Sequence, residues 1–201
     1  VEPAGANCMQ ESLKEGKVVT LPSVNTIADG TAVKRPGDLL FPYIQINVDD
    51  IITIEDSELI VAFLDMVENH KMIVENSGLL TVAALKHLDV KGKKIVSILS
   101  GGNMDVITMS SVIQNGLIQR DRIFTVSVLL PDKPGELVRV SQVIANENGN
   151  VIKLDHNQFV STNRNAAVEL RITMEAFGTD HKNQIVAALE KAGCRPRVVR
   201  A

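Results

Sequence analysis

The chain has 201 residues, enough for one large domain or two small ones, and an ordinary composition of 45% hydrophobic and 22% charged residues. A formal net charge of −3 and an aromatic content of 3% argue against a nucleic-acid-binding protein, which needs basic surfaces and stacking platforms. No apolar stretch reaches the length of a membrane span, and no secretory signal opens the chain. Its two cysteines, Cys8 and Cys194, are too few for a disulfide framework, so the composition favours a cytoplasmic protein.

The beginning of the sequence reads as the end of a strand, because Val1 is followed at once by Glu2 and Pro3. Translation starts with Met, and a natural domain rarely starts inside a strand. We therefore expect the chain to be a carboxyl-terminal piece of a longer protein.

A short strand and two helices are predicted next. The β-branched run at residues 51–54 indicates the strand, and Asp56 or Ser57 is the expected cap of the first helix. The apolar stripe of that helix consists of Ile60, Phe63, Leu64 and Val67. The second helix follows Ser77 and Gly78 and runs to about His87.

The segment from Ile95 to Asn103 has the pattern of a ligand-binding strand end. An apolar run, typical of a buried parallel strand, leads into Ser100, Gly101 and Gly102, and a helix follows. Open α/β sheets bind ligands at the carboxyl ends of their strands. The alternative is that the glycines only make a tight turn while Ser100 caps the helix. The helix carries an apolar face, expected to lie on the sheet, of Val106, Met109, Ile113 and Leu117.

The pattern changes after Asp121, where we place a domain boundary. A strand with one buried face is predicted from the alternation of Phe124, Val126, Val128 and Leu130. A turn at 131–135 leads into a helix with a stripe of Leu137, Val140 and Ile144, and strands follow at 151–160 and 166–174, joined by residues 161–165. A helix capped by Thr179 or Asp180 and a strand at 197–200 complete a ferredoxin-like βαββαβ order.

Four separated motifs in residues 1–121 agree in order and spacing with one enzyme family. They are Val1–Ala6, Thr26–Val33, Glu75–Gly78 and Ile95–Asn103. In these motifs the chain resembles the carboxyl-terminal part of the threonine ammonia-lyases, which use pyridoxal phosphate. The resemblance implies an α/β fold in which residues 1–121 form a partial doubly wound sheet of the tryptophan synthase β-like type.

The resemblance also implies which residues face the cofactor. Ser100 takes the place of a serine that hydrogen-bonds the pyridine nitrogen, Gly30 brings its backbone against the ring, and Glu75 faces the pyridine edge. A hydroxyl suits an unprotonated nitrogen, which makes the ring a weaker electron sink than an aspartate would. The alternative for Glu75 is a solvated charge favoured at the start of a helix.

A metal site is not expected. Glu2 matches a carboxylate that binds a divalent cation in some relatives, but the next acid of that site is replaced by Cys8, and a thiol is a poor ligand for hard cations. The four histidines lack zinc-ligand spacing.

The lysine that bonds the cofactor's aldehyde is also missing. In this family it sits in a Ser-Phe-Lys-like motif near the amino end, and no lysine before Asp121 has that context. We therefore expect this chain to be inactive alone and to bind no pyridoxal phosphate, which belongs to the intact enzyme.

Residues 122–201 resemble an ACT domain, a regulatory module that usually binds amino acids. The likeness depends on the element order and on the turn from Asp132 to Leu137. It implies that backbone N–H groups near Gly135 receive an effector's carboxylate and that Asp132 accepts from its ammonium group. The alternative is an ordinary turn. Because ACT sheets pair through exposed edges, we expect a homo-oligomer formed through residues 122–201.

Together, the resemblances imply deamination of L-threonine to 2-oxobutanoate and ammonia, regulated by an amino-acid effector such as isoleucine or valine. The alternatives are a fragment of a serine dehydratase or serine racemase, and a non-catalytic ACT module that binds amino acids.

Overall fold

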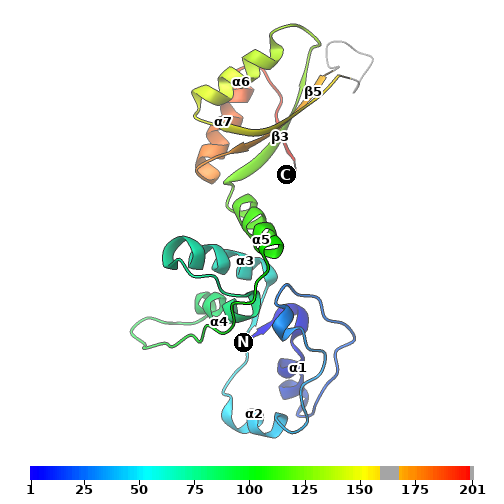
Figure 1. Cartoon of the computed structure of the whole chain (residues 1–201), viewed down its shortest axis with the longest axis vertical. Helices are drawn as coiled ribbons and strands as arrows, with labels where there is room; N and C mark the ends of the chain where they lie inside the picture. Colours follow the sequence, from blue (N-terminus) through cyan, green and yellow to red (C-terminus); the bar gives the residue numbers. More distant parts are fainter. Residues whose placement is uncertain (159–167, 200–201) are drawn as a thin grey trace. The chain divides into compact units, whose positions relative to one another are not determined.

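The structure is a computed structural model that describes residues 1–158 and 168–199. The chain divides into two compact units, Val1–Ile113 and Gln114–Ala201, so the division falls inside helix α5 (Val106–Gln119). Figure 1 shows the two units in the colours of the sequence. Within the ranges described, no helix combines the length and the apolar character needed to cross a bilayer.

The first unit is built mostly from short helices. Its only described sheet is a parallel pair of β1 (Glu2–Pro3) and β2 (Thr53–Ile54). The α-helices are α1 (Cys8–Glu15), α2 (Phe41–Asn47), α3 (Asp56–Asp65) and α4 (Leu80–Ala83). Single turns are η1 (Ala4–Ala6), η2 (Asp29–Thr31), η3 (Met66–His70), η4 (Asn76–Leu79) and η5 (Ala84–His87).

Helix α3 forms where the apolar stripe predicts it, and Phe63 and Leu64 are buried, Phe63 in the core of the unit. The predicted cap is wrong. The residue before the helix is Glu55, whose backbone N–H donates to the Glu58 carboxylate at 3.1 Å. Asp56 is used elsewhere, because its carboxylate accepts from Thr26 Oγ1 at 2.6 Å and from the Ile27 N–H at 3.0 Å. The start of α3 thereby holds the segment that leads to Gly30.

The predicted buried strand at residues 95–99 is not formed. These residues have no strand partner within the described chain, and Val96 and Ile98 are 88% and 72% exposed. An apolar run becomes a strand only when a neighbour supplies backbone hydrogen bonds. The described part of the first unit therefore holds only a two-stranded fragment of the expected doubly wound sheet.

Helix α5 also differs from its prediction in detail. Its cap is Asp105, whose carboxylate accepts from the N–H groups of Ile107 at 2.8 Å and Thr108 at 3.2 Å. Ser100 is therefore not the cap, and that part of the alternative is wrong. Val106, expected on the buried face, is 78% exposed, whereas Val112 is buried.

The second unit is a four-stranded antiparallel sheet with two helices on one face (Figure 1). Its elements are β3 (Ile123–Leu130), α6 (Glu136–Asn146), β4 (Asn150–Asn157), β5 (Val168–Glu175), α7 (Thr179–Lys191) and β6 (Arg197–Val199). In the sheet order β4-β5-β3-β6, the strand that follows each helix is an edge strand: β4 follows α6, and β6 follows α7. This is the predicted split β-α-β arrangement.

The core of the second unit follows the predicted alternation closely. All four predicted inward residues of β3 are buried, and Val126 and Val128 are fully so. From β5, Leu170, Ile172 and Met174 pack against them, and Val140, Ile144, Ile185 and Leu189 come from the helices. Gly178 precedes α7, so neither Thr179 nor Asp180 caps it. The predicted connection at 161–165 and the strand ends next to it lie outside the described residues, as does residue 200.

Candidate functional site

Gly30, Glu75 and Ser77 lie together although they come from two separate segments. A Cβ built on Gly30 would lie 2.9 Å from Ser77 Oγ and 3.6 Å from Glu75 Oε1. Any larger side chain at position 30 would therefore press on the turn that begins η4. Gly30 is also exposed, so its backbone is open to a ligand.

The segment that contains Ser100 contacts the same turn. A Cβ on Gly78 would lie 2.0 Å from the Ser100 carbonyl oxygen, so only glycine permits this approach. The Glu75 N–H donates to the Gly101 carbonyl at 3.3 Å, and the Asn103 N–H donates to Glu75 Oε2 at 3.2 Å. Glu75 thus holds the loop after Ser100 from both its backbone and its side chain.

Gly101 shows how tight this packing is. Its φ is +81°, in the left-handed region that favours glycine, and a Cβ there would lie 2.2 Å from the Glu75 carboxylate. The glycines at 30, 78 and 101 therefore let three segments meet around one carboxylate. We call this group, with Glu75, Ser77 and Ser100, the glycine cluster.

Two buried polar atoms, one in the glycine cluster and one next to it, have no hydrogen-bond partner among the described residues. They are Asn76 Oδ1 and Ser77 Oγ. The other end of the Asn76 amide is held, because Nδ2 donates to the Ile27 carbonyl at 3.0 Å. Buried polar atoms are rarely left unpaired, and an exception often marks a place where a ligand completes the pairing.

The structure therefore brings together the three residues that the resemblance assigns to the cofactor. Ser100 is exposed, and its hydroxyl is left unengaged among the described hydrogen bonds. Sequence reasoning missed Ser77 and Gly78 as members of the site. The sequence did contain a signal for them. A polar run stands directly before an apolar helix, and it contains a glycine in the first turn, where glycine lowers helix stability.

Glu2 has a structural partner in the first unit. Its carboxylate accepts from the N–H groups of Met9 at 2.9 Å and Gln10 at 2.8 Å, so it caps the start of α1. Cys8 is buried next to it, and burial, followed by the negative charge of Glu2, raises the pKa of the thiol. Among the described residues, no group of three or more His, Cys, Asp or Glu side chains is arranged to hold a metal.

Asp132 and Gly135 line one pocket of about 350 Å³ in the second unit. Gly135 has a φ of +88° and is the residue directly before α6. Because glycine has no side chain, it makes no side-chain hydrogen bond to the first N–H groups of α6. Leu137, Val168 and Leu170 supply apolar walls, and His156 also lines the pocket. The pocket thus combines a helix start, a carboxylate and an apolar surface.

A sequence profile described as "Pyridoxal-phosphate dependent enzyme" matches residues 1–101, half of the chain. The chain belongs to this family. The matched range contains Gly30, Glu75 and Ser100.

Curated relatives of this pyridoxal-phosphate family extend the likeness into the second unit. The L-threonine ammonia-lyase of Geobacter sulfurreducens is 36% identical over 96% of the chain, which covers 48% of that protein. The protein of the same description from Thermotoga maritima is 32% identical over 95% of the chain, again covering 48% of its length. The chain spans about half the length of these relatives.

Solved structures give the same family. Maize serine racemase aligns with 57% of the chain and 38% of its own length, at 37% identity and a TM-score of 0.50. The processed form of threonine deaminase isoform 2 from Solanum lycopersicum aligns with 56% of the chain and 32% of its own length, at 33% identity and a TM-score of 0.52. The chain therefore has structural neighbours of the pyridoxal-phosphate enzyme fold, mixed α and β.

The glycine cluster fits one side of a pyridoxal-phosphate site. Gly30 offers backbone without a Cβ, Ser100 offers an unengaged hydroxyl, and Ser77 Oγ is buried and unpaired. A flat aromatic cofactor needs close backbone approach on its face and polar groups at its edge. The cluster has both.

Proposed function

We propose that this chain is part of a threonine ammonia-lyase that converts L-threonine to 2-oxobutanoate and ammonia. The observation that carries the proposal is the meeting of the Gly30, Glu75 and Ser100 segments in one glycine cluster. The likeness to L-threonine ammonia-lyases over almost the whole chain supports the choice of reaction.

In this proposal each residue of the glycine cluster has a distinct task. Ser100 Oγ donates a hydrogen bond to the pyridine nitrogen, and the Gly30 backbone lies against the ring face. Glu75 holds the loop of Gly101 and thereby the position of Ser100. Pyridoxal phosphate, when bound, supplies the electron sink for loss of the α-proton of threonine.

We propose further that this chain alone does not catalyse, because none of its lysines before Asp121 has the family's cofactor-lysine context. Adding pyridoxal phosphate to the 201-residue chain should give no visible absorption band of a lysine-bound cofactor. A stable band that resists dialysis would contradict this part of the proposal.

The second unit is, in the same proposal, an ACT regulatory domain. Its βαββαβ order supports this, as does the pocket that contains Asp132 and Gly135. The effector's carboxylate would lie at the start of α6, with its ammonium group near Asp132 and its side chain toward Leu137. Calorimetry with L-isoleucine and L-valine on the chain and on Asp132→Asn tests this site, and unchanged binding by the variant would contradict it.

Pairing of two ACT units is also proposed. The outer strand β4 is eight residues long and has a free edge within the described sheet. Sedimentation of the chain at high micromolar concentration should show a dimer, and a monomer there would contradict the pairing.

The reaction itself is tested in a polypeptide that joins this sequence to a lysine-bearing amino-terminal half. With L-threonine it should release equal amounts of 2-oxobutanoate and ammonia. Turnover of L-serine alone, or no turnover with cofactor bound, would contradict the threonine ammonia-lyase proposal.

Serine racemisation or dehydration is the second candidate, because maize serine racemase aligns at 37% identity. The same polypeptide separates the two, since a racemase would release D-serine from L-serine faster than 2-oxobutanoate from L-threonine. A non-catalytic amino-acid-binding module is the third, and calorimetric binding without turnover in the joined polypeptide would favour it.

A further inference from the structure

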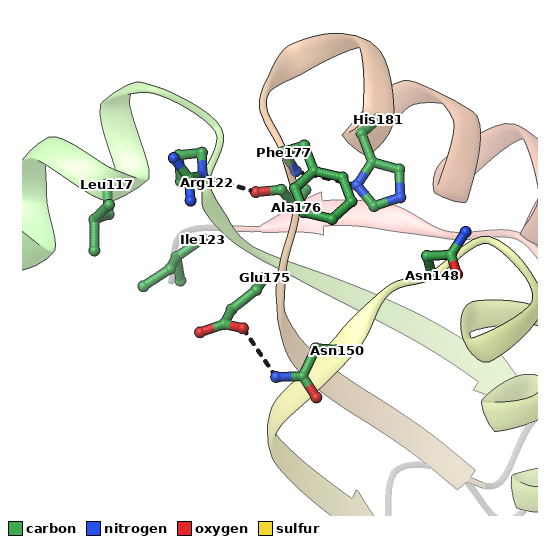
Figure 2. A pocket seen from close by; sticks show the side chains of 9 residues that line it. All are labelled: Leu117, Arg122, Ile123, Asn148, Asn150, Glu175, Ala176, Phe177 and His181. Atoms are coloured by element: carbon green, nitrogen blue, oxygen red, sulfur yellow. Dashed lines mark hydrogen bonds between the residues drawn. The ribbon is translucent and has the colours of Figure 1, made fainter.

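A second cavity of the second unit lies at the opposite end of β3 from Gly135. Its volume is about 210 Å³, smaller than the roughly 300–1,000 Å³ of drug-sized sites. Figure 2 shows the side chains that line it. They come from the last turn of α5, the start of β3, the turn before β4 and its first residue, the end of β5 with the two residues that follow it, and the first turn of α7. Five of the lining residues are polar or charged, namely Arg122, Asn148, Asn150, Glu175 and His181.

Arg122 is held in place by its neighbours, but its terminal nitrogens are not used. Its Nε donates to the Ala176 carbonyl at 3.0 Å, as the dashed line in Figure 2 shows, and the Ala176 N–H donates back to the Arg122 carbonyl at 2.9 Å. Among the described residues, no carboxylate pairs with its Nη1 or Nη2. A fixed guanidinium whose two terminal nitrogens are free is suited to a carboxylate.

Glu175 supplies the opposite charge in the same cavity. Its Oε2 accepts from Asn150 Nδ2 at 2.9 Å, which fixes the carboxylate (Figure 2). Its Oε1 and the Asn150 oxygen remain as acceptors. Arg122 and Glu175 line one cavity and yet form no ion pair with each other in the part of the chain that is described. Each charge is therefore anchored by a neutral neighbour and left for a ligand.

The apolar side of the cavity is also ordered. Phe177 stacks on His181 with ring centroids 4.8 Å apart and an interplanar angle of 18°. The imidazole is held at both nitrogens, because Nδ1 accepts from the Phe177 N–H at 3.1 Å and Nε2 lies 2.6 Å from the Glu147 carbonyl oxygen. Phe177 nevertheless stays 79% exposed, and Ile123 adds a second apolar surface.

We propose that this cavity is a binding site for a small zwitterion, an α-amino acid with a short apolar side chain. The Arg122 Nη groups take its carboxylate in two parallel hydrogen bonds, and Glu175 Oε1 with Asn150 Oδ1 takes its ammonium group. The side chain packs on Ile123 and Phe177. A simple acid would be repelled by Glu175, and a simple amine by Arg122.

This site is separate from the pocket at Asp132 and Gly135. Ile123 lines one and Leu130 the other, and these two ends of β3 are about 24 Å apart at the usual rise of about 3.4 Å per residue. The inference does not depend on the proposed function, because the cavity shares no residue with the glycine cluster or with the pocket at Asp132 and Gly135.

The test is a titration of the 201-residue chain, observed by the backbone amide signals of its NMR spectrum. The probes are L-valine, isobutylamine, which lacks the carboxylate, and isovalerate, which lacks the ammonium group. We expect millimolar L-valine to shift the amides of Ile123, Ala176 and Phe177, and each analogue to bind at least about tenfold more weakly, as expected for loss of one charge-assisted contact. No shift at these amides, shifts only at residues 131–137, or equal binding of one analogue would overturn the proposal.

Matched variants locate the two charges. Arg122→Gln and Glu175→Gln should each weaken L-valine binding at this site by at least about tenfold, whereas Arg171→Gln and Glu190→Gln, at exposed positions outside the cavity, should not. Shifts at 131–137 serve as an internal reference for any binding at the other pocket. If the control variants weaken the Ile123 shifts as much as the cavity variants do, the assignment is wrong. The analogue titrations need no variant, so they decide the outcome even if one variant fails to fold.

Discussion

The apolar runs at residues 95–99 and 123–130 are similar in sequence, but only the second becomes a strand. Strand β3 has β5 on one side and β6 on the other, and its alternate side chains are buried under two helices. Residues 95–99 have no paired neighbour in the described chain, and Val96 and Ile98 face solvent. The local sequence thus shows only that a segment can form a strand. Whether it does depends on distant residues that supply a paired neighbour and a covering layer.

The largest expected effect tests this comparison with the same substitution, isoleucine to alanine, at two positions: one in β5, which pairs with β3, and one within residues 95–99. Ile172→Ala removes a fully buried side chain of β5, so the free energy of unfolding of the second unit should fall by about 2–5 kcal/mol. Ile98→Ala, at a 72% exposed position, should change stability by less than about 0.5 kcal/mol. Urea unfolding with amide exchange of each unit measures both. A large cost at Ile98 would show that residues 95–99 are packed in solution.

A smaller effect is expected in the glycine cluster, which includes Ser100 and Gly101 directly after residues 95–99. Gly101→Ala places a Cβ against the Glu75 carboxylate at a φ of +81°, and should cost about 1–3 kcal/mol. Gly102→Ala is the control, because a Cβ there would come no closer than 3.7 Å to the Ile73 carbonyl oxygen. The lost stability is measured as faster hydrogen exchange of the Leu79 and Leu80 backbone amides. Equal protection in both variants would mean that the loop of Gly101 does not contact Glu75.

The smallest effect compares two ion pairs, one in each unit. Hydrogen bonds from Lys182 and from Thr179 hold the pKa of Asp121 below its usual value, and the Lys182 Nζ lies 2.7 Å from Asp121 Oδ1. Asp121→Asn should lower the stability of the second unit by about 1 kcal/mol at pH 7. The Asp38 carboxylate in the first unit has its pKa lowered by Arg35, but the pair is exposed, so Asp38→Asn should have no measurable effect.

The sign of the pH dependence follows from the lowered pKa of Asp121. The unfolded chain takes up the proton at the ordinary value of about 3.9, before the folded chain does. The stabilisation is therefore complete above that pH and is lost as the pH falls through the lower folded pKa. Unfolding curves of the chain and of Asp121→Asn should converge in acid, and a constant difference across this range would show that the lost stability is not that of the ion pair.

The second unit could be predicted well because its elements are neighbours in sequence. Alternation at Phe124, Val126 and Val128 identifies the buried face of β3, and the helix stripes at Val140 and Ile185 identify what covers it. Helix caps were less predictable. Glu55 and Asp105 were both missed, because several acceptors stand near each helix start and the backbone geometry selects one of them.

The candidate site was predictable only through the family resemblance. Spacing along the chain does not show that Gly30 faces Ser77, or that Gly78 faces the Ser100 carbonyl. Such contacts depend on how Asp56 holds the segment before Gly30, which is a tertiary effect. The glycines themselves were the available signal, since a Cβ at each would press on a neighbouring segment: on the Ser77 side chain at Gly30, on the Ser100 backbone at Gly78 and on the Glu75 carboxylate at Gly101.

The account depends most on the hydroxyl of Ser100 facing the cofactor. Ser100→Ala removes that hydroxyl and leaves the backbone contact with Gly78 in place, so it isolates the proposed hydrogen bond. In the polypeptide that joins this chain to a lysine-bearing half, the variant should lower kcat for L-threonine at least about tenfold, while Ser23→Ala, at an exposed loop position, should leave it unchanged. A Ser100→Ala enzyme with unaltered kcat would contradict the proposed cofactor site.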